Sequence, residues 1–115
     1  MKLTFVLALA LMLQAGAVFA HAGLVKETPA DGASVAAPPA LTLTFTETVT
    51  LAFTGITLKA DGAEVAIGVA ALSEDGLTLT VPTRGSLGAG VYIVEWHALS
   101  EDGHRSHGTY SFSVK

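Results

Sequence analysis

Three segments of the chain alternate apolar and polar residues with a period of two. They are residues 41–46, 77–81 and 109–114, and most of their polar positions are threonine or serine. This pattern predicts strands with one buried face and one face in water. No segment keeps the 3.6-residue period of an amphipathic helix, so we expect little helix.

Shorter patterns predict the remaining strands. Residues 91–99 place Tyr92, Val94 and Trp96 on one face. Weaker strands are expected at residues 24–26, 56–59 and 64–69. Asp-Gly, a strong hairpin signal, occurs four times in the chain. About seven short strands separated by turns predict an all-β fold, an immunoglobulin-like β-sandwich, with a closed barrel as the alternative.

The first twenty residues have the layout of a secretory signal peptide. A positive start at Met1-Lys2 precedes an apolar run over residues 3–13, and Val18 and Ala20 offer the small residues that signal peptidase reads. We expect residues 1–20 to be removed, leaving one domain over residues 21–115 that begins with His21. A membrane anchor needs about 20 apolar residues with stop-transfer flanks, so no membrane span is expected after processing.

The processed chain would be acidic and free of sulfur. Removal of Lys2 leaves five basic residues against ten acidic ones, which argues against nucleic acid as a partner. The 115-residue chain has no cysteine, and both of its methionines lie in the leader. Thiol catalysis is therefore excluded, and the sequence contains no Gly-x-Ser-x-Gly elbow and no phosphate-binding glycine loop.

Histidine is the remaining candidate for chemistry. As a first residue, His21 would offer a metal two nitrogen donors, its α-amine and its imidazole. Asp102 and His104 lie two residues apart, so an extended segment projects them to the same side. Three nitrogens and a carboxylate in a tetragonal arrangement suit Cu(II). From the residues alone, zinc in place of copper, an exposed N-terminal histidine without metal, and an ordinary Asp-Gly turn all stay open.

One acidic residue, Glu47, lies at the end of a predicted strand. Glu47 continues the inward parity of the strand at residues 41–45, where a carboxylate must reach the rim, find a partner or coordinate a metal. A strand-end carboxylate turned to water is an equal alternative.

The string Leu-Ser-Glu-Asp-Gly occurs at residues 72–76 and again at 99–103, and we interpret it as shared turn chemistry. Only the second copy continues into a histidine-containing segment.

Six short motifs are spread over residues 21–115. They are His21-Ala22-x-Leu24-Val25, Thr28-Pro29-Ala30-Asp31-Gly32, Leu43-x-Phe45-x-Glu47, Gly90-Val91-Tyr92-x-Val94-x-Trp96, Ser100-x-Asp102-Gly103-His104 and Gly108-x-Tyr110-x-Phe112-x-Val114. Together they resemble the CopC-type copper-resistance proteins of the bacterial periplasm. The specific part of the resemblance is a histidine directly after the leader combined with a late Asp-x-His.

The resemblance implies a Greek-key β-sandwich that binds Cu(II) through His21, Asp102 and His104. It implies Glu47 as an additional ligand or near neighbour. It also implies a monomeric periplasmic carrier or buffer that works beside an inner-membrane protein of the CopD type. Some members of this family hold Cu(I) in a loop rich in methionine and histidine. Residues 53–58 contain neither, so a Cu(II)-only member is expected.

The other two histidines are predicted to be surface residues. The parity of His97 is opposite to that of Trp96, and the parity of His107 is opposite to that of His104. Histidine is common on exposed polar faces, so neither residue is expected to be a ligand of the tight copper site.

Two alternatives belong to other function classes. A copper-dependent oxidase or polysaccharide monooxygenase also uses an N-terminal histidine with a second histidine. Those enzymes are larger and carry aromatic substrate-facing surfaces, whereas this chain has one tryptophan and two tyrosines, mostly at core parity. The other alternative is a structural sandwich with incidental histidines. We predict a binding protein and not an enzyme.

Overall fold

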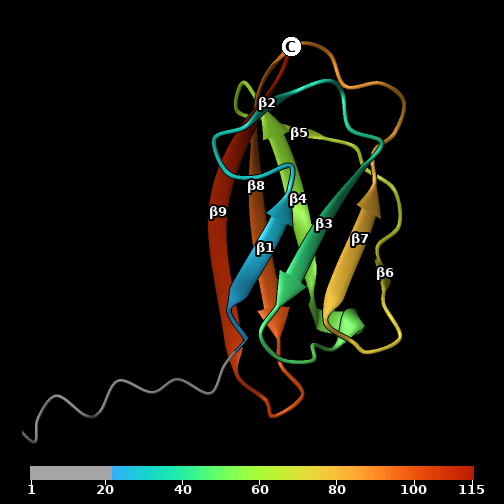
Figure 1. The fold of residues 1–115 in the computed structure, drawn as a ribbon, viewed down its shortest axis with the longest axis vertical. Coiled ribbons are helices and arrows are strands. Elements are labelled where there is room, and N and C mark those ends of the chain that lie inside the picture. The colour runs from blue at the N-terminus through green and yellow to red at the C-terminus, as the bar shows by residue number, and fades with distance from the viewer. Residues whose placement is uncertain (1–21) are drawn as a thin grey trace, which may run out of the picture.

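Strands dominate the computed structural model, which describes residues 22–115 (Figure 1). They are β1 (Leu24–Thr28), β2 (Ser34–Val35), β3 (Ala40–Phe45), β4 (Gly55–Ala60), β5 (Ala63–Val65), β6 (Ala71–Leu72), β7 (Thr78–Pro82), β8 (Gly90–Leu99) and β9 (Arg105–Val114). Within this range the single helical element is the 3₁₀ turn η2 (Leu51–Phe53). The expectation of little helix therefore holds for the described residues.

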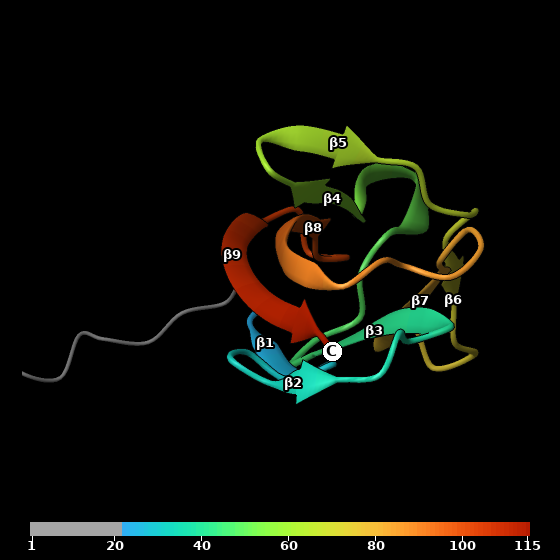
Figure 2. The same cartoon turned by 90° about the horizontal axis from the view of Figure 1, so that it is seen from above.

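The strands form two sheets that lie face to face, as the view from above makes plain (Figure 2). One sheet has the order β1-β3-β7-β6 and the other has the order β2-β9-β8-β4-β5. All neighbours are antiparallel except β2 and β9, which run parallel. The chain changes sheet five times, between β1 and β2, β2 and β3, β3 and β4, β5 and β6, and β7 and β8. The predicted all-β, immunoglobulin-like Greek-key sandwich is confirmed, and the two separate sheets rule out the closed barrel.

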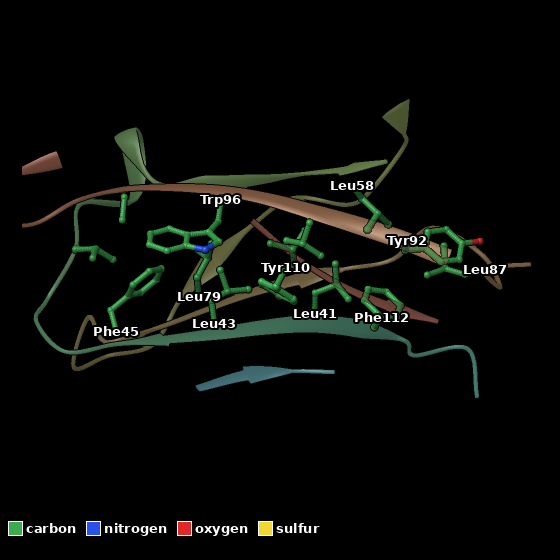
Figure 3. Close-up of a cluster of buried hydrophobic side chains, with 14 of the residues drawn as sticks. Leu41, Leu43, Phe45, Leu58, Leu79, Leu87, Tyr92, Trp96, Tyr110 and Phe112 are labelled. Carbon is green, nitrogen blue, oxygen red and sulfur yellow. The ribbon is translucent and has the colours of Figure 1, made fainter. Parts of the chain in front are cut away.

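Inward-facing side chains of the long strands fill the space between the sheets (Figure 3). In β3 the buried residues Leu41, Leu43 and Phe45 alternate with half-buried positions, as the period of two predicts. In β8 the three residues expected to face the core are also buried. The rings of Phe45 and Trp96 meet edge to face with centroids 5.6 Å apart. These contacts join the two sheets through one continuous apolar core.

Gly108 provides the space that Trp96 occupies. The two residues are direct partners across β8 and β9. A Cβ atom at position 108 would lie 2.7 Å from Nε1 of the indole and 2.8 Å from Cε2. No ordinary carbon contact is that short, so any side chain at position 108 would force the indole of Trp96 to move.

Most boundaries lie within two residues of the predicted ones, and the larger differences are three. Strand β9 begins at Arg105, four residues earlier than expected, because its register with β8 is unbroken from Gly90↔Val114 to Leu99↔Arg105. The predicted strand over residues 64–69 ends at Val65, and Ile67 makes only an isolated bridge. Strands β2 and β6 have two residues each, too few to show a period, and they were not predicted.

The predicted leader and the start of the processed domain lie outside the described residues. Cleavage before His21 therefore stays a prediction. Over residues 22–115 no helix has both the length and the apolar character that a membrane crossing requires.

Candidate metal centre

The turn between β8 and β9 positions Asp102 and His104 at one end of the sandwich (Figure 1). The backbone N–H of Ser100 donates to the carbonyl of His104 at 2.9 Å, and the N–H of Gly103 donates to the carbonyl of Ser100 at 2.9 Å. Gly103 has a φ of 94°, a conformation that glycine adopts without strain. The backbone of the turn is thus closed by its own hydrogen bonds.

Within this turn, Oδ1 of Asp102 accepts more than one hydrogen bond. The hydroxyl of the buried Ser100 donates to Oδ1 of Asp102, and the backbone N–H of His104 donates to the same oxygen at 3.3 Å. Nδ1 of the His104 imidazole lies 3.0 Å from Oδ1. The structure therefore brings the predicted pair Asp102 and His104 into direct contact.

These hydrogen bonds also set the charge of the turn. The Ser100 hydroxyl is the main cause that holds the pKa of the Asp102 carboxyl below its ordinary value, and the contact with His104 adds to the effect. Asp102 is therefore an anion at neutral pH. All of its hydrogen bonds within residues 22–115 use Oδ1, so Oδ2 is available to a cation.

The first copy of the repeated pentapeptide builds nearly the same turn between β6 and β7. The Ser73 hydroxyl donates to Oδ1 of Asp75 at 2.6 Å, and the N–H of Leu77 donates to the same atom at 3.1 Å. The pKa of Asp75 is lowered, again mainly by the serine. This match supports the interpretation as shared turn chemistry. The chemical difference is that the second turn carries His104 where the first carries Leu77.

The segment after β3 lies between these two turns. The N–H of Val49 donates to the carbonyl of Gly76 at 3.0 Å, and the N–H of Thr50 donates to the carbonyl of Leu99 at 2.8 Å. Thr48 makes a further link, because its hydroxyl donates to Oε1 of Glu101 at 3.0 Å. The backbone that carries Glu47 is therefore fixed beside both turns.

Glu47 itself is half-buried in this segment. Among residues 22–115 no three histidine or acidic side chains form a cluster able to hold a metal ion. The structure thus places Glu47 on the neighbouring segment but does not join it to Asp102 and His104 as a third ligand. His21 lies outside the described residues.

The residue that follows His21 is held beside the Asp102–His104 turn. Ala22 is fully buried, and its carbonyl accepts a hydrogen bond of 2.7 Å from the hydroxyl of Ser106. Gly23 pairs with Thr46 in both directions: the Gly23 N–H donates to Thr46 Oγ1, and the Thr46 N–H donates to the Gly23 carbonyl, each at 2.9 Å. Ser106 and Thr46 thus anchor the segment that follows His21. The sequence did not identify either residue, since a serine and a threonine in strand-like segments give no signal of this role.

The comparison with protein families covers nearly the whole described region. Residues 24–115 match the model of the CopC domain family. This chain belongs to the CopC domain family. The predicted resemblance is thereby confirmed at the level of the family.

Named relatives of this CopC domain span most of its length. Protein YobA of Escherichia coli (strain K12) is 43% identical over 101 residues, which cover 85% of this chain and 82% of YobA. Copper resistance protein C of Xanthomonas campestris pv. juglandis is 37% identical over 119 residues, 97% of this chain and 94% of that protein. The crystal structure of PcoC, a methionine-rich copper resistance protein from Escherichia coli, aligns with a TM-score of 0.76 at 35% identity. That alignment covers 84% of this chain and 100% of the PcoC chain.

This CopC domain differs from a methionine-rich protein in its donor set. Residues 22–115 contain no methionine and no cysteine. The segment from η2 into β4 presents Leu51 and Phe53 as partly exposed apolar side chains instead. Nitrogen and oxygen are therefore the donors that its described side chains can offer to a metal.

The last two histidines lie on the surface, as predicted. His97 of β8 and His107 of β9 are both exposed. They are direct partners across the two strands. Their parity places them on the outer face of the five-stranded sheet, on the side away from Trp96 and the core.

Proposed function

We propose that this CopC domain binds one Cu(II) ion at the end of the sandwich and acts in the periplasm as a copper carrier or buffer. The proposed ligands are the α-amine and imidazole of His21 with the side chains of His104 and Asp102, and Glu47 is a neighbour or weak additional ligand. The observation that carries the proposal is the hydrogen bond from Ser106 to the carbonyl of Ala22.

This contact limits where His21 can lie. A trans peptide keeps consecutive Cα atoms about 3.8 Å apart, so His21 is tethered within one residue of the buried Ala22. Ser106 is two residues beyond His104, about 6.6 Å along an extended strand. We therefore expect an imidazole and an α-amine at position 21 to come within side-chain reach of the Asp102–His104 turn.

The chemistry of the donors favours Cu(II) over Cu(I). Imidazole and amine nitrogens with a carboxylate suit the tetragonal geometry of Cu(II). Cu(I) prefers thiolate and thioether ligands, and residues 22–115 contain neither. A tight one-to-one complex with Cu(I) under reducing conditions would contradict this assignment.

The position of the turn suits transfer of the ion to another molecule. The side chains of Asp102 and His104 are 44% and 55% exposed, so a partner can approach the metal directly. Relatives of this chain carry the name copper resistance protein C, which supports a role in copper resistance or homeostasis. We propose an inner-membrane protein of the CopD type as the partner, and transfer of the ion without turnover of a substrate.

A comparison of two N-termini tests the proposed centre. Protein that begins at His21 is titrated with Cu(II), and the coordinated nitrogens are counted by electron paramagnetic resonance. Protein with one additional glycine before His21 loses the amine from the chelate, so we expect fewer nitrogens and an affinity at least ten-fold lower. Equal affinity and an equal nitrogen count in the two proteins would refute the N-terminal site.

Two histidine variants test the second part of the ligand set. His104→Ala is expected to abolish tight Cu(II) binding, because a metal ligand is lost. His107→Ala, three residues further along β9, is the matched control and should retain the tight site. If both variants lost it equally, the assignment of His104 would be wrong.

A further inference from the structure

A second pair of histidines stands apart from the proposed centre, on the outer surface of the five-stranded sheet. His97 of β8 is the direct antiparallel partner of His107 of β9. The neighbours Trp96 and Ala98 are buried, so the side chain of His97 points away from the core. Strands β9, β8 and β4 lie side by side on this face (Figure 2).

The backbone ladder makes this pair one of the closely spaced kind. Ser100 donates its N–H to the carbonyl of His104, so position 100 is a hydrogen-bonding position on the side of β8 that faces β9. Hydrogen-bonded and non-hydrogen-bonded pairs alternate along an antiparallel ladder. Three steps along the same unbroken register, His97 and His107 form a non-hydrogen-bonded pair. Opposite Cα atoms in such a pair are about 4.5 Å apart, and their side chains lie closest.

The imidazole of His97 rests over Gly55 of the neighbouring strand β4. Gly55 is the partner of His97 on the other flank, in β4. A Cβ atom on Gly55 would lie 3.4 Å from Cε1 and 3.7 Å from Nε2 of this ring. The ring therefore rests over a position without a side chain. Exposed side chains exchange rotamers within picoseconds to nanoseconds, so the ring can turn toward His107.

In the described part of the chain, the charged side chains near the two imidazoles form no ion pair with them. Glu95, the next outward residue on β8, forms an ion pair of 3.3 Å with Lys59 of β4. Arg105 is the next outward residue on β9 toward the turn. Within residues 22–115 the imidazole of neither His97 nor His107 makes a hydrogen bond or an ion pair. Both rings thus keep their nitrogen donors for another ligand.

We infer that His97 and His107 form a second, weaker site for a divalent transition-metal ion, with Cu(II) as the ion held most tightly. Imidazole binds copper, nickel and zinc, and Cu(II) has the highest affinity in the divalent series. Two imidazoles spanning adjacent strands chelate one ion, and water completes its coordination. This site is independent of the proposed centre, because the two use different residues and His107 lies about 10 Å along the strand from His104.

Titration with Cu(II) alone tests the pair. In protein that begins at His21, a second equivalent of Cu(II) should broaden the backbone amide signals of Gly55, His97 and His107. The variants His97→Gln and His107→Gln should each weaken this second step about ten-fold or more, since a single imidazole loses the chelate. Thr109→Ala, an exposed change on the same strand, is the control and should leave the second step unchanged.

The N-terminally extended protein separates this inference from the proposed function. It should still bind Cu(II) at the histidine pair even though its N-terminal centre is weakened. Two results would overturn the inference. One is a second step that survives in both glutamine variants. The other is a stoichiometry of one Cu(II) ion per two chains in the second step, together with dimers detected by analytical ultracentrifugation. That result would mean that the ion is bound between two molecules.

Discussion

Asp102 and Asp75 occupy equivalent positions in two turns of the same sequence, which makes each a control for the other. Both accept a hydrogen bond from a serine two residues earlier, and both have a lowered pKa. Turn formation and metal binding can therefore be separated by changing one aspartate at a time.

The first prediction uses this pair. Asp102→Asn should keep the turn but weaken Cu(II) binding about ten-fold or more, because an amide oxygen is a poorer ligand for copper than a carboxylate. Asp75→Asn should leave copper affinity unchanged. Calorimetric titration of both variants with Cu(II) checks this, and equal losses in the two would show that the turn, and not the ligand, matters.

The two lowered pKa values also predict how stability changes with pH. A carboxyl group whose pKa is depressed by folding stabilises the folded state above its unfolded pKa, near 3.9, and this stabilisation is lost as pH falls through the folded pKa. The lowered pKa of Asp75 therefore makes Asp75→Asn destabilising at pH 7, with a difference that shrinks below about pH 4. Urea unfolding at several pH values measures it, and a difference that grew in acid would contradict the assigned cause.

Some residues of the candidate site could be identified from the sequence and others could not. Asp102 and His104 could be identified because a two-residue spacing and the repeated pentapeptide are visible in the sequence. Ser106 and Thr46 could not, because their role depends on which segment lies opposite them. Only the packing of residues 22–23 against β9 and the end of β3 reveals that role.

Among the elements, β9 connects the turn that carries Asp102 and His104 to the core. Its first half carries His107 on the outer face and Ser106 toward Ala22, and its second half fills the core with Tyr110 and Phe112. The predicted strand began at residue 109 because alternation is visible only where inward positions are apolar. Residues 105–108 are polar or glycine, so their place in the ladder comes from pairing with β8.

Loss of the Ser106 anchor should weaken copper binding without affecting the fold. Ser106→Ala removes the hydrogen bond to the Ala22 carbonyl, a contribution of about 1 kcal/mol, or about five-fold in affinity if the held segment carries a ligand. Thr109→Ala is the matched control on the same strand. Cu(II) titration measures the effect, and an unchanged affinity would mean that this anchor does not position the ligand.

Gly108→Ala should destabilise the sandwich. The new methyl group would lie 2.7 Å from the indole of Trp96, so the ring must move, at a cost of about 1–3 kcal/mol. Gly88→Ala is the control, because its Cβ would meet no atom within 4 Å. Urea unfolding of the two variants checks the difference, and equal stabilities would mean that Trp96 accommodates the methyl group at no cost.

For the whole molecule, the core and the candidate centre are separate. The buried residues join the two sheets through apolar contacts, and the turn that carries Asp102 and His104 lies at their rim. The domain should therefore stay folded after a chelator removes copper. The alternation of apolar residues made this architecture predictable. The two-residue strand β2 was not predictable, because it pairs with the distant β9, and β6 is too short to show a period although it pairs with the next strand, β7.

Copper should nevertheless raise the thermal stability of the domain. A ligand that binds only the folded state stabilises it by about 2.7 kcal/mol at one hundred times its dissociation constant. Scanning calorimetry with and without excess Cu(II) should show a higher Tm with copper. An unchanged Tm in protein that begins at His21 would contradict binding to the folded state, and an unfolded apo-protein would contradict the separation of core and centre.

The buried Ala22 determines at which stage of maturation the proposed centre is completed. Because Ala22 fits into the sandwich directly after His21, the domain can fold with additional residues still attached in front. A folded precursor would lack the terminal amine, and with it one arm of the chelate. Proteolytic maturation, and not folding, would then switch on tight copper capture, and a newly made chain would not withdraw copper from the compartment in which it is synthesised.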